Sequence, residues 1–148
     1  MHPTAARVQQ RLHDLGLEVE VVVLPDSART AVEAAAAIGV EVGQIVKSLV
    51  FTRDGEPVLV LCAGDRQVDA KRLSLSRANA DDVRKATGFA IGGIPPLGHD
   101  SKLETVVDVS LRRFETVWAA AGTPHAVFEV STAALIAAIP DATVAEVA

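Results

Sequence analysis

The chain has 148 residues and a formal net charge of −5 at pH 7, and 49% of its residues are hydrophobic. This length and composition indicate one globular domain, residues 1–148, and exclude a disordered chain. The acidic balance and the 3% content of aromatic residues argue against a broad, non-specific nucleic-acid surface. Because no apolar run approaches the roughly 18 residues of a membrane span and no signal peptide is recognisable, a cytoplasmic location without membrane contact is expected.

The N-terminal segment alternates between helical and extended patterns. Apolar residues at helical spacing predict a first helix that ends near Gly16, and the run 18–24 predicts a strand that stops at the following proline. Thr30 followed by Glu33 has the pattern of a capping box and predicts a helix that Gly39 ends.

The next segment predicts a β-hairpin. Residues 41–51 have the pattern of a strand, residues 53–56 contain an Asp-Gly turn, and residues 57–64 are the returning strand. Lys47 then shares one face of its strand with apolar residues only. An ammonium group in such surroundings is costly unless its head reaches water or an anion. The sequence leaves both possibilities open for Lys47.

The C-terminal half mixes helices and strands. Residues 66–76 predict a short helix with flanking loops, and Asn79 is expected to cap a helix over residues 80–87. Residues 89–100 begin as a strand and continue as an irregular loop, because two glycines and two prolines are crowded together there. Three more strands and a last helix are expected at 105–111, 116–122, 125–131 and 133–139.

The order of these elements favours one fold class. About six or seven strands and about four or five helices are expected, without strict βαβ alternation. The prediction is therefore an α+β fold. Its centre would be a mixed, mostly antiparallel, barrel-like sheet of about six to seven strands surrounded by helices.

Conventional catalytic and metal-binding motifs are missing from the sequence. There is no CxxC, HExxH, GxSxG or GxGxxG pattern, and no two of the four histidines have metal-ligand spacing. We therefore expect no metal ion and no cofactor. The single cysteine, Cys62, excludes an intramolecular disulfide, and its apolar surroundings indicate a buried core residue.

A glycine- and proline-rich loop at residues 92–98 is the second candidate site feature beside Lys47. Glycine lets the backbone approach a ligand closely, and consecutive glycines can turn their N–H groups toward one point. The prolines fix the shape of the loop. Such a loop can bind a carboxyl group, an ester carbonyl or a phosphate, but composition alone favours an ordinary rigid connection.

Three motifs occur in a fixed order along the chain: VGQIVKSLVF, GFAIGGIPPLGH and VWAAAGTPHAVFEVS. Together they resemble the YbaK/EbsC family, aminoacyl-tRNA deacylases related to the editing insertion domain of bacterial prolyl-tRNA synthetase. The resemblance extends from Ala28 to near Ile139. It implies a free-standing domain with a mixed β-barrel and outer helices. It also implies trans-editing, the hydrolysis of the ester that joins a wrong amino acid to a tRNA.

The resemblance further implies site residues. Lys47 is expected to contact the 3′ end of the tRNA, and backbone groups of Gly92 and Gly93 to stabilise the developing oxyanion, so these three form the expected catalytic set. No protein nucleophile is needed, because a water molecule can attack an ester that is already reactive. The expected substrate-binding residues are Thr30, Ser48, Ile94, Pro95, His99, Gly122 and His125.

The implied partners are a mischarged tRNA, held at its 3′ acceptor end, and prolyl-tRNA synthetase. The cysteine-specific branch of the family carries SGGKRGLD where this chain has AAGTPHAV, so the serine and aspartate of that branch fall at Ala120 and Val127. This difference favours tRNA-Pro carrying alanine, serine, threonine or 2-aminobutyrate over cysteine. His125 lies in the replaced segment and borders either the amino-acid pocket or solvent.

Two other functions remain open on the sequence alone. The same fold can hold an acceptor end, or dock on a synthetase, without hydrolysis, because no acid–base residue is evident. Hydrolysis of a small free ester or of an aminoacyl-nucleotide is the other alternative. The sequence does not determine the oligomeric state.

Overall fold

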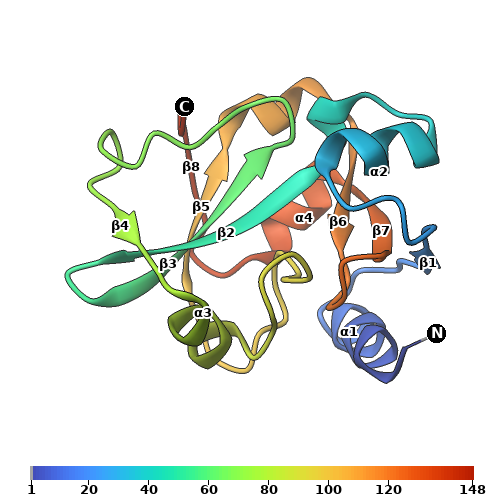
Figure 1. Ribbon diagram of the computed structural model, residues 1–148, viewed down its shortest axis with the longest axis horizontal. Coiled ribbons are helices and arrows are strands. Elements are labelled where there is room, and N and C mark those ends of the chain that lie inside the picture. The colour runs from blue at the N-terminus through green and yellow to red at the C-terminus, as the bar shows by residue number, and fades with distance from the viewer. Residues whose placement is uncertain (1) are drawn as a thin grey trace.

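Four α-helices, two short 3-10 helices and two β-sheets make up residues 2–148, the part of the chain that this computed structural model describes (Figure 1). The helices are α1 (Pro3–Asp14), α2 (Ala31–Ile38), η1 (Val42–Gln44), α3 (Ala80–Thr87), η2 (Val109–Arg113) and α4 (Thr132–Ala138). The strands are β1 (Val21–Val23), β2 (Val46–Arg53), β3 (Glu56–Ala63), β4 (Ser76–Arg77), β5 (Glu104–Asp108), β6 (Thr116–Ala120), β7 (Ala126–Ser131) and β8 (Thr143–Ala145).

The larger sheet has the strand order β4-β2-β3-β5-β8 and is built on the predicted hairpin. β2 and β3 pair antiparallel from Arg53–Glu56 at the turn to Val46–Ala63 at the far end. The turn residues Asp54 and Gly55 have φ values of 53° and 81°. Positive φ at both central residues is what a type I′ hairpin turn requires, and Asp-Gly is a preferred sequence for it. β5 and β8 add in parallel on the β3 side.

The smaller sheet has the order β1-β7-β6 and is antiparallel throughout. The two sheets meet where β2 approaches β6, on the right of the larger sheet in Figure 1. One parallel bridge, Ile45 to Trp118, joins them there. The predicted α+β class is confirmed. In place of one barrel-like sheet, however, residues 2–148 form two sheets that separate beyond this bridge.

The core follows the strand alternation that the sequence predicts. Val46 and Val50 of β2 face the main core, which includes Phe128 and Leu61, whereas Leu49 and Phe51 pack on a second cluster around Val58 and Val60. β3 is buried on both faces, as expected of a strand in the middle of a sheet.

The predicted helix starts are confirmed by their caps. Thr30 accepts the Glu33 N–H at 3.1 Å, and Glu33 in turn accepts the Thr30 N–H at 3.1 Å. Asn79 and Asp82 form the same reciprocal arrangement at α3. A capping box of this kind satisfies main-chain donors that the first helical turn leaves free.

Several element predictions are wrong. Residues 66–75 form irregular chain and turns instead of a helix, and Ser76 begins β4: the Asp69 carboxylate accepts the Arg72 N–H at 3.2 Å, and Ser74 has a φ of 56°. Residues 89–91 are not a strand, because the Phe89 N–H donates to the Thr87 hydroxyl at 3.0 Å. The strand expected over 41–51 is preceded by a 3-10 helix at 42–44, and the strand expected over 105–111 ends at Asp108. The short strands β4 and β8 were not predicted.

Within residues 2–148, none of the helices has both the length and the apolar character needed to cross a membrane.

Candidate active site at the edge between the two sheets

A cavity of about 260 Å³ opens where β2 and β6 separate. Five segments form its wall: residues 28–34 at the start of α2, residues 45–49 at the start of β2, the loop at 91–94, β6 with the turn after it, and Val127 of β7. The wall is mostly alanine, valine and isoleucine. Drug-sized ligand pockets are typically ~300–1,000 Å³, so this cavity is matched to a group of amino-acid size.

The edge of β2 turns main-chain polar groups toward this cavity. Arg53 and Glu56 flank the two-residue turn and form a hydrogen-bonded pair, so the alternation along the ladder directs the N–H and C=O of Ser48 away from β3. β4 pairs with β2 only at Phe51 and Thr52. The Ser48 main chain therefore has no strand partner within residues 2–148 on the cavity side.

The edge of β6 is arranged in the same way. The Ala121 N–H donates to the Ala126 carbonyl of β7 at 2.8 Å, so the alternation directs the N–H and C=O of Ala120 away from β7. After the Ile45–Trp118 bridge, no further β-bridge joins β2 to β6 in the described chain. The cavity thus lies between two strand edges that carry hydrogen-bonding groups available to a ligand.

Lys47 is one of five predicted site residues in the cavity wall, together with Thr30, Ser48, Gly92 and Ile94. Its Nζ donates to the carbonyl oxygen of Arg66. No carboxylate in residues 2–148 lies within ion-pair distance of this ammonium group. The positive charge of Lys47 is therefore positioned but not neutralised.

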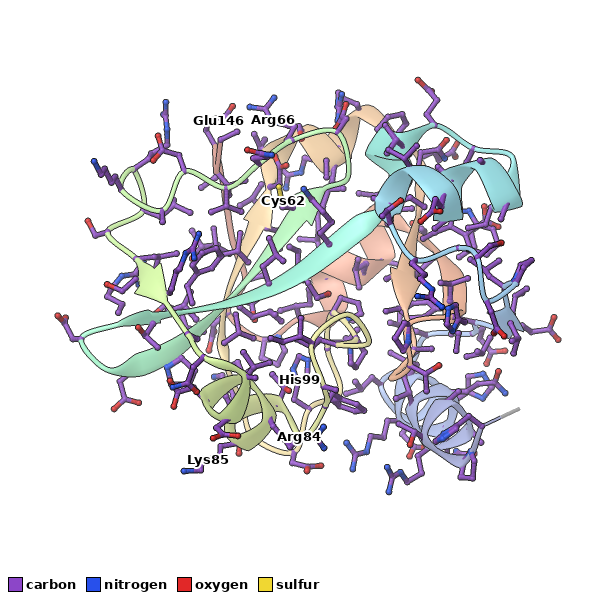
Figure 2. The ribbon with its side chains drawn as sticks, viewed as in Figure 1. Cys62, Arg66, Arg84, Lys85, His99 and Glu146 are labelled. Atoms are coloured by element: carbon purple, nitrogen blue, oxygen red, sulfur yellow. The ribbon has the colours of Figure 1, made fainter. Side chains whose placement is uncertain are left out.

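Cys62 lies directly across the ladder from Lys47. Its Sγ is 3.5 Å from the same Arg66 carbonyl oxygen, and Figure 2 shows it below the turn that carries Arg66. Burial raises the pKa of the Cys62 thiol to about 11; the charge of Lys47 opposes this rise, and Asp108 adds to it. The predicted buried position of Cys62 is confirmed, and the thiol is protonated at neutral pH.

The two glycines of the loop have different surroundings. Gly92 is exposed, has a φ of +94°, and its N–H meets no acceptor within the described residues. Gly93 is buried, and its N–H donates to the Ala90 carbonyl at 3.2 Å. A methyl group added at Gly93 would lie 2.8 Å from the Gly122 carbonyl oxygen. Gly92 thus offers a free amide at the cavity, while Gly93 permits close contact between two loops.

His99 lies outside this cavity. Its Nε2 is 2.7 Å from the Pro95 carbonyl oxygen, and its ring meets Phe89 edge-on with centroids 6.3 Å apart. Burial lowers the pKa of His99, and the nearby charge of Arg11 lowers it further. His99 borders a separate cavity of about 160 Å³. Its contacts make it a residue that holds the proline loop in shape.

The remaining predicted residues also lie beside the cavity instead of in its wall. Pro95 is buried and supplies the carbonyl that His99 contacts. Gly122 packs on α1, where an added methyl group would lie 2.8 Å from Thr4. The Nε2 of His125 is 3.2 Å from the Asp26 carbonyl oxygen.

Sequence reasoning missed most of the apolar residues of the wall and one of its cations, Arg29. Trp118, the only tryptophan of the chain, lines the cavity from β6, and its Nε1 is buried without a partner in the described residues. The Oγ of Ser48 on β2 is likewise buried without a partner in the described residues. Ile91, 61% exposed, stands at the mouth. A lone tryptophan in a strand of alanines was the available signal for Trp118.

Within residues 2–148, no group of three or more histidine, cysteine, aspartate or glutamate side chains is placed to hold a metal ion. The polar groups of the cavity are the Lys47 ammonium, the Arg29 guanidinium, the Ser48 Oγ and the Trp118 Nε1, together with free main-chain amides and carbonyls. Such a set is chemically suited to a ligand that has both an anionic and a carbonyl part.

Residues 25–138 match the model of the aminoacyl-tRNA editing domain family, and the chain belongs to that family. The resemblance to YbaK-type editing domains is thereby confirmed. The chain is 35% identical over 121 residues to the uncharacterised protein YwhH of Bacillus subtilis, with 77% of each chain covered. It is 38% identical over 86 residues to the proline–tRNA ligase of a Geobacter species, covering 53% of this chain but only 15% of the ligase.

Solved structures agree with the family. A candidate trans-editing enzyme for prolyl-tRNA synthetase superposes with a TM-score of 0.93 at 45% identity, covering 99% of this chain and 98% of that one. The hypothetical protein APE2540 superposes with a TM-score of 0.83 at 29% identity, over 95% of this chain and 98% of that one. The α+β architecture described above is therefore that of editing-domain proteins.

Proposed function

We propose that this protein is a trans-editing aminoacyl-tRNA deacylase that hydrolyses the ester of a mischarged tRNA. The preferred substrate is tRNA-Pro that carries a small amino acid such as alanine, serine, threonine, 2-aminobutyrate or cysteine. One observation carries the proposal: the ammonium-bearing Lys47 and the free amide of Gly92 border one cavity of amino-acid size in a member of the editing family.

The chemistry that the cavity supports is attack by water on the ester carbonyl carbon. A C–O bond to water forms, and the carbonyl oxygen takes up negative charge. The Gly92 N–H is the donor available to that oxyanion, and one such donor is typically worth about 3 kcal/mol in the transition state. The ester C–O bond then breaks, and the ribose oxygen leaves with a proton. The products are a free amino acid and an uncharged tRNA.

The proposed role of Lys47 is to hold the terminal adenosine. Its neutral partner, the Arg66 carbonyl, fixes the ammonium group without cancelling its charge. A phosphate or ribose oxygen of the 3′ end is then attracted to the cavity mouth. Holding an ester in a productive geometry lowers the barrier by removing rotational and translational freedom before the reaction.

The wall of the cavity supports a small, apolar amino-acid side chain. Ala120 and Val127, which stand where the cysteine-specific branch has serine and aspartate, both line it. Ala28 and Ala34 line it as well. An apolar pocket distinguishes side chains by only about 1–3 kcal/mol per methylene, so we expect alanine and 2-aminobutyrate to be accepted together and cysteine to have no advantage.

A panel of mischarged tRNAs tests the proposal. Purified protein is incubated with tRNA-Pro carrying alanine, serine, threonine, 2-aminobutyrate, cysteine or proline, and loss of the ester is followed with time. We expect fast loss for the small residues and slow loss for proline. If every ester persists while the protein binds the tRNA, the domain is a binding module without catalysis. If uncharged tRNA-Pro does not compete, the substrate is a small ester instead.

A further inference from the structure

The turn at residues 63–66, here called the Arg66 turn, is the point to which Lys47 is tied. The Arg66 N–H donates to the Ala63 carbonyl at 3.0 Å and closes a β-turn, and the Arg66 carbonyl oxygen accepts from the Lys47 ammonium. Because a lysine has a flexible four-carbon stem, its ammonium is held only as firmly as its partner. The position of the Lys47 charge therefore depends on what holds this turn.

Close packing holds one side of the Arg66 turn. A methyl group added at Gly64 would collide with the Val42 carbonyl oxygen and lie 3.2 Å from the Cβ of Ala31. Ala31 begins α2 and belongs to the cavity wall. On another side, the Arg66 side chain pairs with Glu146 (Figure 2). The turn is thus in direct contact with an element that forms part of the cavity.

A buried carboxylate holds the start of the Arg66 turn. Asp108, fully buried at the end of β5, accepts the Ala63 N–H at 3.0 Å and the Ser110 N–H at 2.8 Å. The Ser110 carbonyl in turn accepts the Arg113 Nε–H at 2.7 Å. Asp108 therefore connects the turn to η2, the short helix that carries Arg113.

Arg113 closes this network at the protein surface. Its two terminal nitrogens donate to the two carboxylate oxygens of Asp65, at 2.9 and 2.8 Å. A bidentate pair fixes direction as well as distance. Hydrogen bonding to Arg113 holds the pKa of the Asp65 carboxyl below its usual value, so the pair is intact at neutral pH. Asp65 immediately precedes Arg66, and the pair therefore restrains the residue next to the partner of Lys47.

Resting on the proposed function, we infer that the Asp65–Arg113 pair is a positioning pair: it holds the Arg66 carbonyl where that carbonyl directs the Lys47 ammonium to the substrate. Neither member of the pair needs to contact the substrate for this role. The pair is half-exposed, so its loss should cost little stability. Breaking it should therefore change the reaction more than the fold.

Single-turnover hydrolysis of alanyl-tRNA-Pro tests the role of the pair. Asp65→Ala and Arg113→Gln are compared with the wild type, each alone and each combined with Lys47→Ala. These two substitutions remove opposite charges, so a displaced lysine lowers the rate in both, whereas a change in local potential acts in opposite directions. Glu104→Ala is the matched control, because it breaks a similarly exposed pair with Arg53 at the hairpin end of β2.

We expect Asp65→Ala and Arg113→Gln each to lower the rate roughly fivefold, and to lower it no further once Lys47 is replaced by alanine. Glu104→Ala should match the wild type. Opposite effects of the two substitutions, a loss that adds to that of Lys47→Ala, or an equal loss in the control would each overturn the inference.

Chemical labelling of the lysines tests the positioning without any catalysis. Reductive methylation is followed at each lysine by peptide mass spectrometry, with the exposed Lys71, Lys85 and Lys102 as internal references. Released from its anchor, Lys47 should be methylated roughly fivefold faster in the two variants than in the wild type. Unchanged labelling of Lys47 would overturn the inference, whatever the activity. Faster labelling without hydrolysis by the wild type would support the anchoring and refute the proposed function.

Discussion

Lys47 on β2 and Cys62 on β3 stand directly opposite each other, and the side chains of both reach the carbonyl oxygen of Arg66. The pair differs sharply in charge: the lysine carries an ammonium without a carboxylate partner, and burial keeps the thiol protonated. The Arg66 turn thus fixes the Lys47 ammonium, the cation that we assign to substrate. It does so without a negative charge that would compete with a phosphate.

The buried thiol makes the folded state sensitive to alkali. The pKa of Cys62 is about 11 in the folded chain against 9.0 for the ordinary thiol, so the folded state holds this proton more tightly. The contribution to stability is complete below pH 9 and is lost as the pH rises toward 11. At pH 10 the loss is about 1.4 kcal/mol.

Urea unfolding at pH 8 and pH 10 checks this expectation for the wild type and for Cys62→Ala. Between pH 8 and pH 10 the free energy of unfolding should fall by about 1.4 kcal/mol less in the variant than in the wild type. An equal change in both proteins would mean that Cys62 does not titrate in this way.

His99 gives a pH dependence in the acid range. Burial and the Arg11 charge lower its pKa in the folded state, so the unfolded chain takes up the proton first. The stabilisation is present above pH 6.5 and is lost as the pH falls. His99→Gln should flatten the fall in thermal midpoint between pH 7 and pH 5. A fall of the same size in both proteins would contradict the assignment of His99 as a buried neutral residue.

The two loop glycines should respond differently to alanine. At Gly93 the added methyl group meets the Gly122 backbone at 2.8 Å, so stability and activity should fall together. At Gly92 the added group has room, and the cost is the positive φ, roughly 1–2 kcal/mol. In denaturant unfolding, Gly93→Ala should therefore have a lower free energy of unfolding than Gly92→Ala. The reverse order would show that the loop moves freely.

The size of the cavity can be altered from β6. Ala120 lines it and is half-buried, so Ala120→Val places two methyl groups in space that a substrate side chain would use. Hydrolysis of 2-aminobutyryl-tRNA-Pro should fall relative to alanyl-tRNA-Pro, roughly tenfold or more in the ratio of kcat/KM. An unchanged ratio would place the amino-acid side chain elsewhere.

Local signals predicted the elements that depend on neighbouring residues. The Asp54-Gly55 turn and the Thr30–Glu33 capping box each involve residues close in sequence, and both formed as expected. The division into two sheets was not predictable in this way, because it depends on how far β2 and β6 stay together. The short strand β8 was not predictable either, because it forms by pairing with the distant strand β5.

The site was predictable only where it depends on a local sequence pattern. The apolar alternation around Lys47 is visible in the sequence, and that residue does line the cavity. The sequence could not show that the Gly93 N–H donates to the Ala90 carbonyl, or that the His99 ring contacts the Pro95 carbonyl. Both facts depend on how the loop folds back on itself.

The most direct test of the account is the single-turnover hydrolysis of alanyl-tRNA-Pro by the wild type and by Lys47→Ala. Cys62→Ala serves as a neighbouring control that leaves the cavity charge intact. We predict that Lys47→Ala loses roughly a hundredfold or more in rate while its thermal unfolding shows a folded protein, and that the control keeps its activity. Wild-type hydrolysis by folded Lys47→Ala would contradict the assignment of this cavity as the editing site.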